Sequence, residues 1–318
     1  MLISNFAVYG VSMGVFVVIQ FIFHIPEGWL IVHTTEGLAN VGLQAPYEDI
    51  SSFGSIAVAV FIFAAANVRA STLFGLVINI FGCSCLLIMT MASWSRGAWL
   101  SGLVFLLLIA MIKLPRSFAI TLMLLGFGAV VAINIDANRS FWTNHPYPAR
   151  LLGLVRIEKI TNKDAGRLNL YRKAGRMLSE HPYIGHGIGS FYLKSVEYAD
   201  PNDSRGRIPD FAHNVFIQIA VEEGIPVAAL YASLIIWTFS RGFGALRVER
   251  HKSSSYSTTQ MLILGITLSL GAYLQTQMTA NSLNVYLTNQ FFFWFLVSAI
   301  LIMSIEDFEP SADTLIAH

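Results

Sequence analysis

Long apolar runs separated by short polar segments dominate the chain. Eight of these runs contain 16 to 24 residues, and about 20 helical residues cross the hydrocarbon core of a membrane. The pattern therefore predicts an all-α, polytopic membrane protein with about eight transmembrane helices. The predicted spans are residues 6–23, 50–66, 70–93, 97–112, 117–135, 225–240, 260–279 and 288–305.

Composition supports this class. Apolar residues make up 55% of the chain and charged residues 12%, against about 25% charged residues in soluble domains. The net charge of +1 gives no reason to expect a nucleic-acid partner. No Asp, Glu, Lys, Arg or His lies inside a predicted span, whereas ion-coupled transporters place such groups near the bilayer midplane. Neutral polar residues in the spans, such as Ser84, Thr276 and Gln277, are expected to bond across helices.

The distribution of lysine and arginine predicts the orientation. If the N-terminus is cytoplasmic, seven basic residues of the short loops fall inside and only Arg96 falls outside. The remaining 12 of the 20 basic residues lie in one long loop, which the rule does not weigh. The predicted layout is five spans in 1–135, an extracytoplasmic catalytic loop with amphipathic helices in 136–224, and three spans with a short cytoplasmic tail in 225–318. The first run lacks a basic flank and a cleavage site, so it is interpreted as a retained helix.

The long loop carries several polar motifs. Arg167 to Ser179 has helical spacing, with Leu168, Tyr171, Gly175 and Leu178 predicted on one side and Arg172 and Arg176 on another. Such a basic amphipathic helix fits either substrate binding or contact with anionic lipid headgroups.

A glycine motif follows, Gly185-His186-Gly187-Ile188-Gly189. Alternating glycines permit positive φ angles and close approach of the backbone. The motif is interpreted first as a tight turn that returns the chain to the membrane, and alternatively as a nest of amides for phosphate oxygens. His186 is assigned no role.

The loop closes with His213-Asn214 and Glu222-Glu223-Gly224. Asp210 is predicted to cap the next helix, which would place His213 in its first turn. The helix dipole would then favour a neutral imidazole.

These motifs, in this order, resemble the large extracytoplasmic loop of the O-antigen ligase family. Ser95-Arg96-Gly97, at a predicted membrane edge, resembles a second motif of that family. The likeness covers about Trp94 to the C-terminus. Members of the family usually have more spans N-terminal to Ser95, so the chain is expected to be either a compact member or truncated.

The resemblance implies a multi-pass enzyme of the bacterial inner membrane with its active loop on the periplasmic side. A glycan on undecaprenyl diphosphate would be transferred to an acceptor hydroxyl, in ligases that of the lipid A core. Polysaccharide polymerases and protein O-oligosaccharyltransferases are related alternatives. A small-solute permease is the alternative of another class.

The resemblance also implies the site residues. His213 is the expected general base, and Asn214 is expected to hold or orient a neighbouring group. Arg96 and Arg167 are expected to bind the donor diphosphate, with Arg172 and Arg176 as weaker candidates. No cofactor and no metal are expected, because the donor already carries its activation. A metal site at His24 and His33 is not favoured, since no ligand spacing links them.

Overall fold

The computed structural model describes residues 30–35, 38–43, 50–68, 73–93, 95–115, parts of 117–125, 157–199, 211–248, 258–280 and 287–306. The predicted span at 6–23, His24 and the predicted cap Asp210 lie outside the described residues. The helices are α2 (Ile50–Ala66), α3 (Leu73–Ala92), α4 (Arg96–Lys113), α8 (Ile157–Glu180), α9 (Ser190–Lys194), α10 (Val215–Glu223), α11 (Ile225–Val248), α12 (Thr258–Ala280) and α13 (Leu287–Glu306).

The helical fold class is confirmed, with one addition. Strands β1 (Leu30–Thr35) and β2 (Leu38–Leu43) form an antiparallel hairpin within the loop predicted between the first two spans. Six predicted spans coincide with α2, α3, α4, α11, α12 and α13. Within the described part of the chain, three helices are long and apolar enough to cross a membrane, namely α4, α11 and α12. The predicted count of eight is therefore not confirmed.

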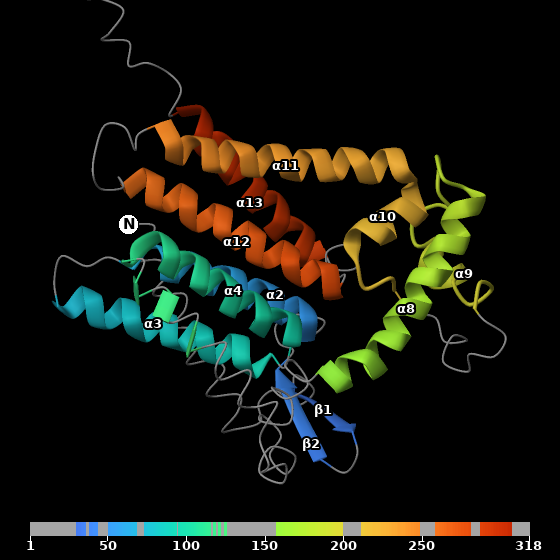
Figure 1. Cartoon of the computed structure of the whole chain (residues 1–318), viewed down its shortest axis with the longest axis horizontal. Helices are drawn as coiled ribbons and strands as arrows, with labels where there is room; N and C mark the ends of the chain where they lie inside the picture. Colours follow the sequence, from blue (N-terminus) through green and yellow to red (C-terminus); the bar gives the residue numbers. More distant parts are fainter. Residues whose placement is uncertain are drawn as a thin grey trace, which may run out of the picture.

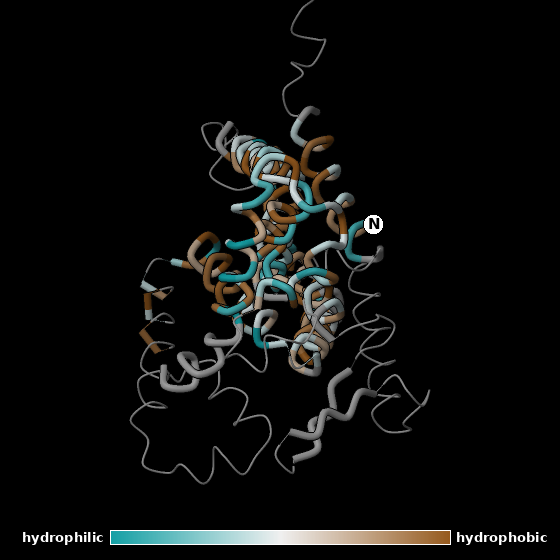
Figure 2. Tube along the Cα trace, turned by 90° about the vertical axis from the view of Figure 1, so that its right-hand side faces the viewer, coloured by the Kyte–Doolittle hydropathy of each residue, from teal (hydrophilic) through white to brown (hydrophobic). Residues whose placement is uncertain are grey.

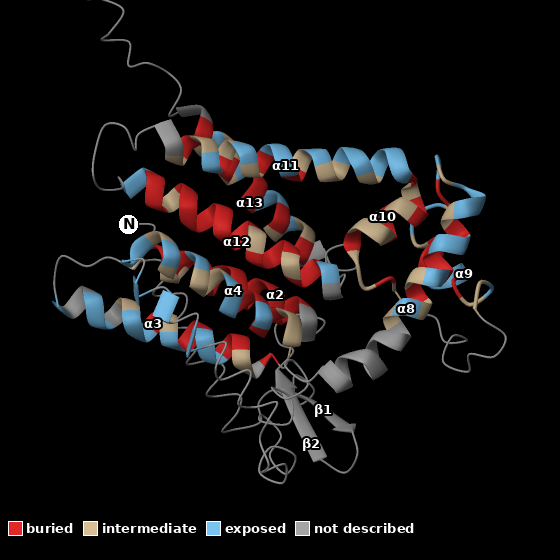
Figure 3. Ribbon diagram, viewed as in Figure 1, coloured by how far each residue is buried: buried red, intermediate tan, exposed pale blue. Residues whose placement is uncertain are grey.

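Helix α12 forms the centre of the bundle. It lies between α2 and α4 on one side and α11 and α13 on the other (Figure 1), and its side chains are mostly buried (Figure 3). By contrast, α3 and α11 expose large apolar side chains, including Ile80 and Phe81 on α3 and Leu230 and Trp237 on α11. Apolar residues recur along the bundle helices (Figure 2). Exposed apolar faces of this extent fit helices that contact lipid.

Hydrogen bonds across the bundle fix which helix ends lie together. The Ser101 hydroxyl, near the start of α4, donates to the carbonyl of Ala272 late in α12 over 2.8 Å. Thr276 bonds Ser55 near the start of α2 over 2.7 Å. The Tyr273 hydroxyl donates to Asn289 near the start of α13. The starts of α2, α4 and α13 therefore share one end of the bundle with the end of α12, which we call the site end.

The cross-helix bond predicted for Thr276 is thus confirmed, but the bond predicted for Ser84 is wrong. The Ser84 hydroxyl donates to the carbonyl of Ile80 in its own helix over 2.9 Å. Its position is exposed, and a serine without a neighbouring helix satisfies its donor on the preceding turn.

Helices α8, α9 and α10 lie beyond the site end (Figure 1). Aromatic rings connect α10 to the bundle. The ring centroids of Phe216 and Tyr231 of α11 are 5.7 Å apart, and those of Tyr231 and Phe293 of α13 are 5.6 Å apart. A small second core then joins α8, α9 and α10. Its buried members are Leu170, Ala174, Met177, Phe191, Ala212 and Val221.

The helix predicted for residues 167–179 is confirmed and extends to Ile157–Glu180, but its predicted apolar side is wrong. The buried face carries Leu170, Lys173, Ala174 and Met177, whereas Leu168 is 48% exposed. This face packs on α10, and Lys173 is almost fully buried on it.

Candidate functional site

The glycine motif docks on the C-terminal end of α10. The amide of His186 donates to the carbonyl of Val221 over 2.9 Å, and the amide of Gly187 donates to that of Glu222 over 2.8 Å. The amide of Ile225 donates to the carbonyl of Pro182 over 2.9 Å. Two motifs distant in sequence are therefore joined backbone to backbone. We call residues 181–191 the glycine loop.

Two glycines in this contact have no room for a side chain. A Cβ on Gly185 would lie 2.4 Å from the backbone of Glu222, and one on Gly224 would lie 2.2 Å from the carbonyl oxygen of Tyr183. Both have positive φ, at 65° and 95°. Only glycine combines this conformation with such close approach. The predicted tight turn is therefore confirmed.

The alternative of a phosphate-binding nest is wrong for the three loop amides that already donate to backbone carbonyls. Gly185, His186 and Gly187 each donate their amide to a backbone carbonyl, those of His181, Val221 and Glu222 respectively. These donors are satisfied by the docking on α10, and they do not serve an anion.

A buried polar network supports the same contact. Glu222 is 5% exposed, and its Oε1 accepts the amide of Phe191 over 3.3 Å and the Nε2 of Gln218. The Oε1 of Gln218 in turn accepts the amide of Ala212 over 2.9 Å. Because a buried donor without a partner is costly, this network fixes the segment before α10 relative to the glycine loop. Gln218 was not among the predicted site residues, and only its spacing of four from Glu222 on one helix face could have indicated it.

His213 and Asn214 stand at the start of α10. Asn214 is the N-cap: its Oδ1 accepts the amides of Phe216 over 3.0 Å and Ile217 over 3.3 Å. His213 precedes this cap with a φ of 49°. The predicted position of His213 inside the first helical turn is therefore wrong. Asparagine is itself among the best N-caps, and Gln218 holds the preceding Ala212 in place.

The predicted diphosphate ligands come from two elements. Arg167 is half-buried on α8, while Arg172 and Arg176 are exposed on it. Arg172 donates to Asn169 Oδ1 over 3.0 Å, and Arg176 donates to the carbonyl of Tyr198 over 2.9 Å. The same helix buries Lys173, which is 3% exposed and was not among the predicted site residues.

Arg96 is the first residue of α4, at the site end of the bundle. Ser95 caps this helix by accepting the amide of Ala98 over 3.4 Å. A Cβ on Gly54 of α2 would lie 2.8 Å from both Ser93 Oγ and Ser95 Cβ. Gly54 therefore lets α2 pack against the turn that carries Arg96. No local motif marks it, because the contact is between distant segments.

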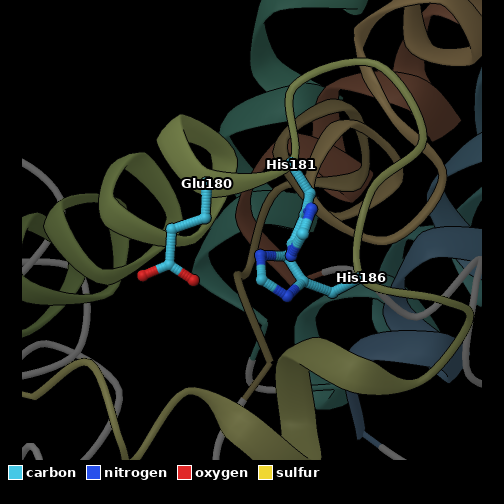
Figure 4. Close-up of side chains that lie close together, drawn as sticks. All are labelled: Glu180, His181 and His186. Carbon is cyan, nitrogen blue, oxygen red and sulfur yellow. The ribbon is translucent and has the colours of Figure 1, made fainter.

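His186, His181 and Glu180 lie together at the end of α8 (Figure 4). The two imidazole rings meet edge to face with centroids 4.7 Å apart. The Tyr198 hydroxyl donates to Glu180 Oε2, and this hydrogen bond is the largest cause that raises the pKa of Tyr198 to about 12. No local sequence pattern predicts this cluster, since the histidines are not spaced as ligands on one helix.

Comparison with known families identifies the region that holds these motifs. Residues 81–232 match the family model described as Wzy_C, O-antigen ligase. None of the curated proteins compared with the chain gives a significant match. The matched region runs from α3 into α11 and includes Arg96, the glycine loop and His213-Asn214. The resemblance drawn from the sequence is thus confirmed for residues 81–232, which are similar to the O-antigen ligase family model.

Proposed function

We propose that this protein transfers a glycan from undecaprenyl diphosphate to an acceptor hydroxyl at the outer face of the bacterial cytoplasmic membrane, and that the acceptor is the lipid A core. The family match supports a lipid-linked glycan transferase. The apolar helices support a multi-pass membrane protein. The orientation, with the glycine loop on the periplasmic side, is carried by the bias of basic residues in the short loops.

One observation carries the proposal. The His213-Asn214 turn and the start of α4 with Arg96 belong to the same end of the bundle, because Phe216 packs on Tyr231 of α11 and Tyr231 packs on Phe293. A lipid-linked diphosphate has its charged group at the membrane edge and its glycan outside. A base and a cation at this edge are the groups that its transfer requires.

The proposed step uses His213 as general base. Its imidazole takes the proton of the acceptor hydroxyl while that oxygen attacks the anomeric carbon of the donor sugar. The bond from this carbon to the diphosphate oxygen breaks, and undecaprenyl diphosphate leaves with the electron pair. The proton on His213 then passes to solvent. Asn214, as helix cap, orients the turn that carries the base.

Arg96 and Arg167 are the proposed ligands of the diphosphate. A guanidinium group offers paired donors that match phosphate oxygens and stays charged at any working pH. Arg172 and Arg176 are weaker candidates, since Arg176 already binds the Tyr198 carbonyl. The step requires no metal and no cofactor, because the diphosphate is itself an activated leaving group.

A single incubation separates the alternatives. Purified protein is given a polyprenyl-diphosphate glycan with or without a core-lipid acceptor. Transfer only in the presence of acceptor supports ligation. Chain growth without acceptor indicates a polysaccharide polymerase, and transfer to an added protein acceptor indicates a protein O-oligosaccharyltransferase. No transfer under any condition contradicts the proposal and favours a small-solute permease.

A further inference from the structure

The cluster at the end of α8 has the composition of a metal site. Glu180, His181 and His186 offer one carboxylate oxygen and two imidazole nitrogens, and these ligand atoms all lie within 4.8 Å of one another (Figure 4). On a tetrahedral zinc ion, with bonds of about 2.0 Å, ligand atoms lie about 3.3 Å apart. Glu180 and His181 are exposed, so rotation of their side chains can close the difference.

One ring nitrogen of His186 has a hydrogen-bond partner outside the cluster. Its Nε2 lies 2.7 Å from the carbonyl oxygen of Met177. A carbonyl only accepts hydrogen bonds, so Nε2 is the donor in this contact and Nδ1 is the ring nitrogen left for a metal ion. Histidine ligands in metal sites commonly donate their second ring nitrogen to a backbone carbonyl, which fixes the tautomer and the ring orientation.

Glu180 is also oriented from outside the cluster. The Tyr198 hydroxyl donates to its Oε2, and the carbonyl of Tyr198 is held by Arg176 over 2.9 Å. Carboxylates that bind metals are typically hydrogen-bonded in this way. Two of the three proposed ligands therefore have a hydrogen-bond partner outside the cluster, as ligands in metal sites commonly do. Such partners are not expected for exposed polar residues that meet by chance.

We propose that Glu180, His181 and His186 bind one divalent transition-metal ion, with zinc as the preferred occupant and water completing the coordination. Two imidazoles and a carboxylate suit zinc better than calcium or magnesium, which prefer oxygen ligands alone. The ion would join the last residue of α8 to the middle of the glycine loop and so stabilise the loop on α10. The site contains neither His213 nor the diphosphate arginines, and it does not rest on the proposed transfer reaction.

The test is direct zinc binding to the full-length protein, purified without a histidine tag and stripped with chelator. Competition with a chromogenic chelator is expected to give one zinc ion per chain. Cobalt(II), used as a spectroscopic probe, is expected to give visible absorption bands of a tetrahedral site. Glu180→Gln, His181→Ala and His186→Ala are each expected to weaken zinc binding at least about tenfold.

Matched controls are Glu197→Gln, an exposed carboxylate of the same segment, and His251→Ala, a histidine elsewhere in the chain. Both are expected to bind zinc like the wild type. His181 is exposed and its replacement is not expected to disturb folding, which a size-exclusion profile checks. Absence of stoichiometric zinc binding, or wild-type affinity in His181→Ala, overturns the site. Glycan transfer by the stripped protein is assayed separately, so that failure of the metal site and failure of the proposed reaction are distinguishable.

Discussion

The amide of Phe191 donates to the carboxylate of Glu222 over 3.3 Å, although 31 residues separate them in sequence. The end of the glycine loop is thereby fixed to the helix that His213 precedes. Glu222 also accepts a hydrogen bond from Gln218, and Gln218 accepts one from Ala212. One buried carboxylate therefore joins the glycine loop to the turn that carries the proposed base.

Replacing Glu222 by alanine is therefore expected to destabilise the protein. The variant leaves two buried donors without partners, each costing about 1 to 3 kcal/mol. The expected result is a lower Tm in detergent and a reduced kcat. An unchanged Tm would show that the network does not hold the loop.

Glu223→Gln is expected to have the opposite effect on stability. Partial burial, and then the charge of Glu222, raise the pKa of Glu223 above its ordinary value. A raised pKa means that ionisation weakens the folded state as pH increases from the ordinary value through the raised one. The variant should thus have a higher Tm than wild type at pH 7.5, and the difference should shrink as the pH falls through the raised pKa and vanish below the ordinary one. A lower Tm at pH 7.5 contradicts this.

His213→Ala is expected to lower single-turnover glycan transfer by about 100- to 10,000-fold, the usual contribution of a positioned base, while donor binding is retained. His251→Ala is the control histidine. Near-full activity of His213→Ala would remove it from the mechanism.

Arg96→Ala and Arg167→Ala are each expected to cost about 2 to 4 kcal/mol of transition-state stabilisation. Lysine at either position should restore only part of the rate, since it lacks the paired donors. Arg247→Ala, at the opposite end of α11, serves as the control. Wild-type turnover by one of the alanine variants, with protein levels matched, excludes that arginine from the site.

The orientation is tested with single cysteines in a variant whose Cys83 and Cys85 are replaced by alanine. A cysteine at Ser179 on α8 should react with an impermeant thiol reagent in spheroplasts, and one at Thr258, the first residue of α12, should not. The reverse pattern would place the proposed site on the cytoplasmic side.

The sequence was sufficient for features that depend on local composition. Apolar runs predicted six helices that the structure contains, and alternating glycines predicted the tight turn. Features that depend on distant partners were missed or wrong. Leu168 and Leu170 are equally apolar, but Leu170 belongs to the small core shared with α9 and α10, whereas Leu168 is exposed. Asp210 and Asn214 are both good helix caps, and the structure shows Asn214 as the cap of α10, with the bond from Ala212 to Gln218 beside it.

The close approach at Gly185 and Gly224 limits how the site can move. The glycine loop is bonded to the last residues of α10 and to the first residue of α11, and neither contact has space to slide. The glycine loop is therefore expected to move together with the start of α11, which is long and apolar enough to cross the membrane. It is not expected to open as a lid. Any rearrangement that admits the proposed lipid-linked donor is therefore expected in other segments, and a tilt of α11 in the bilayer is expected to move the glycine loop with it.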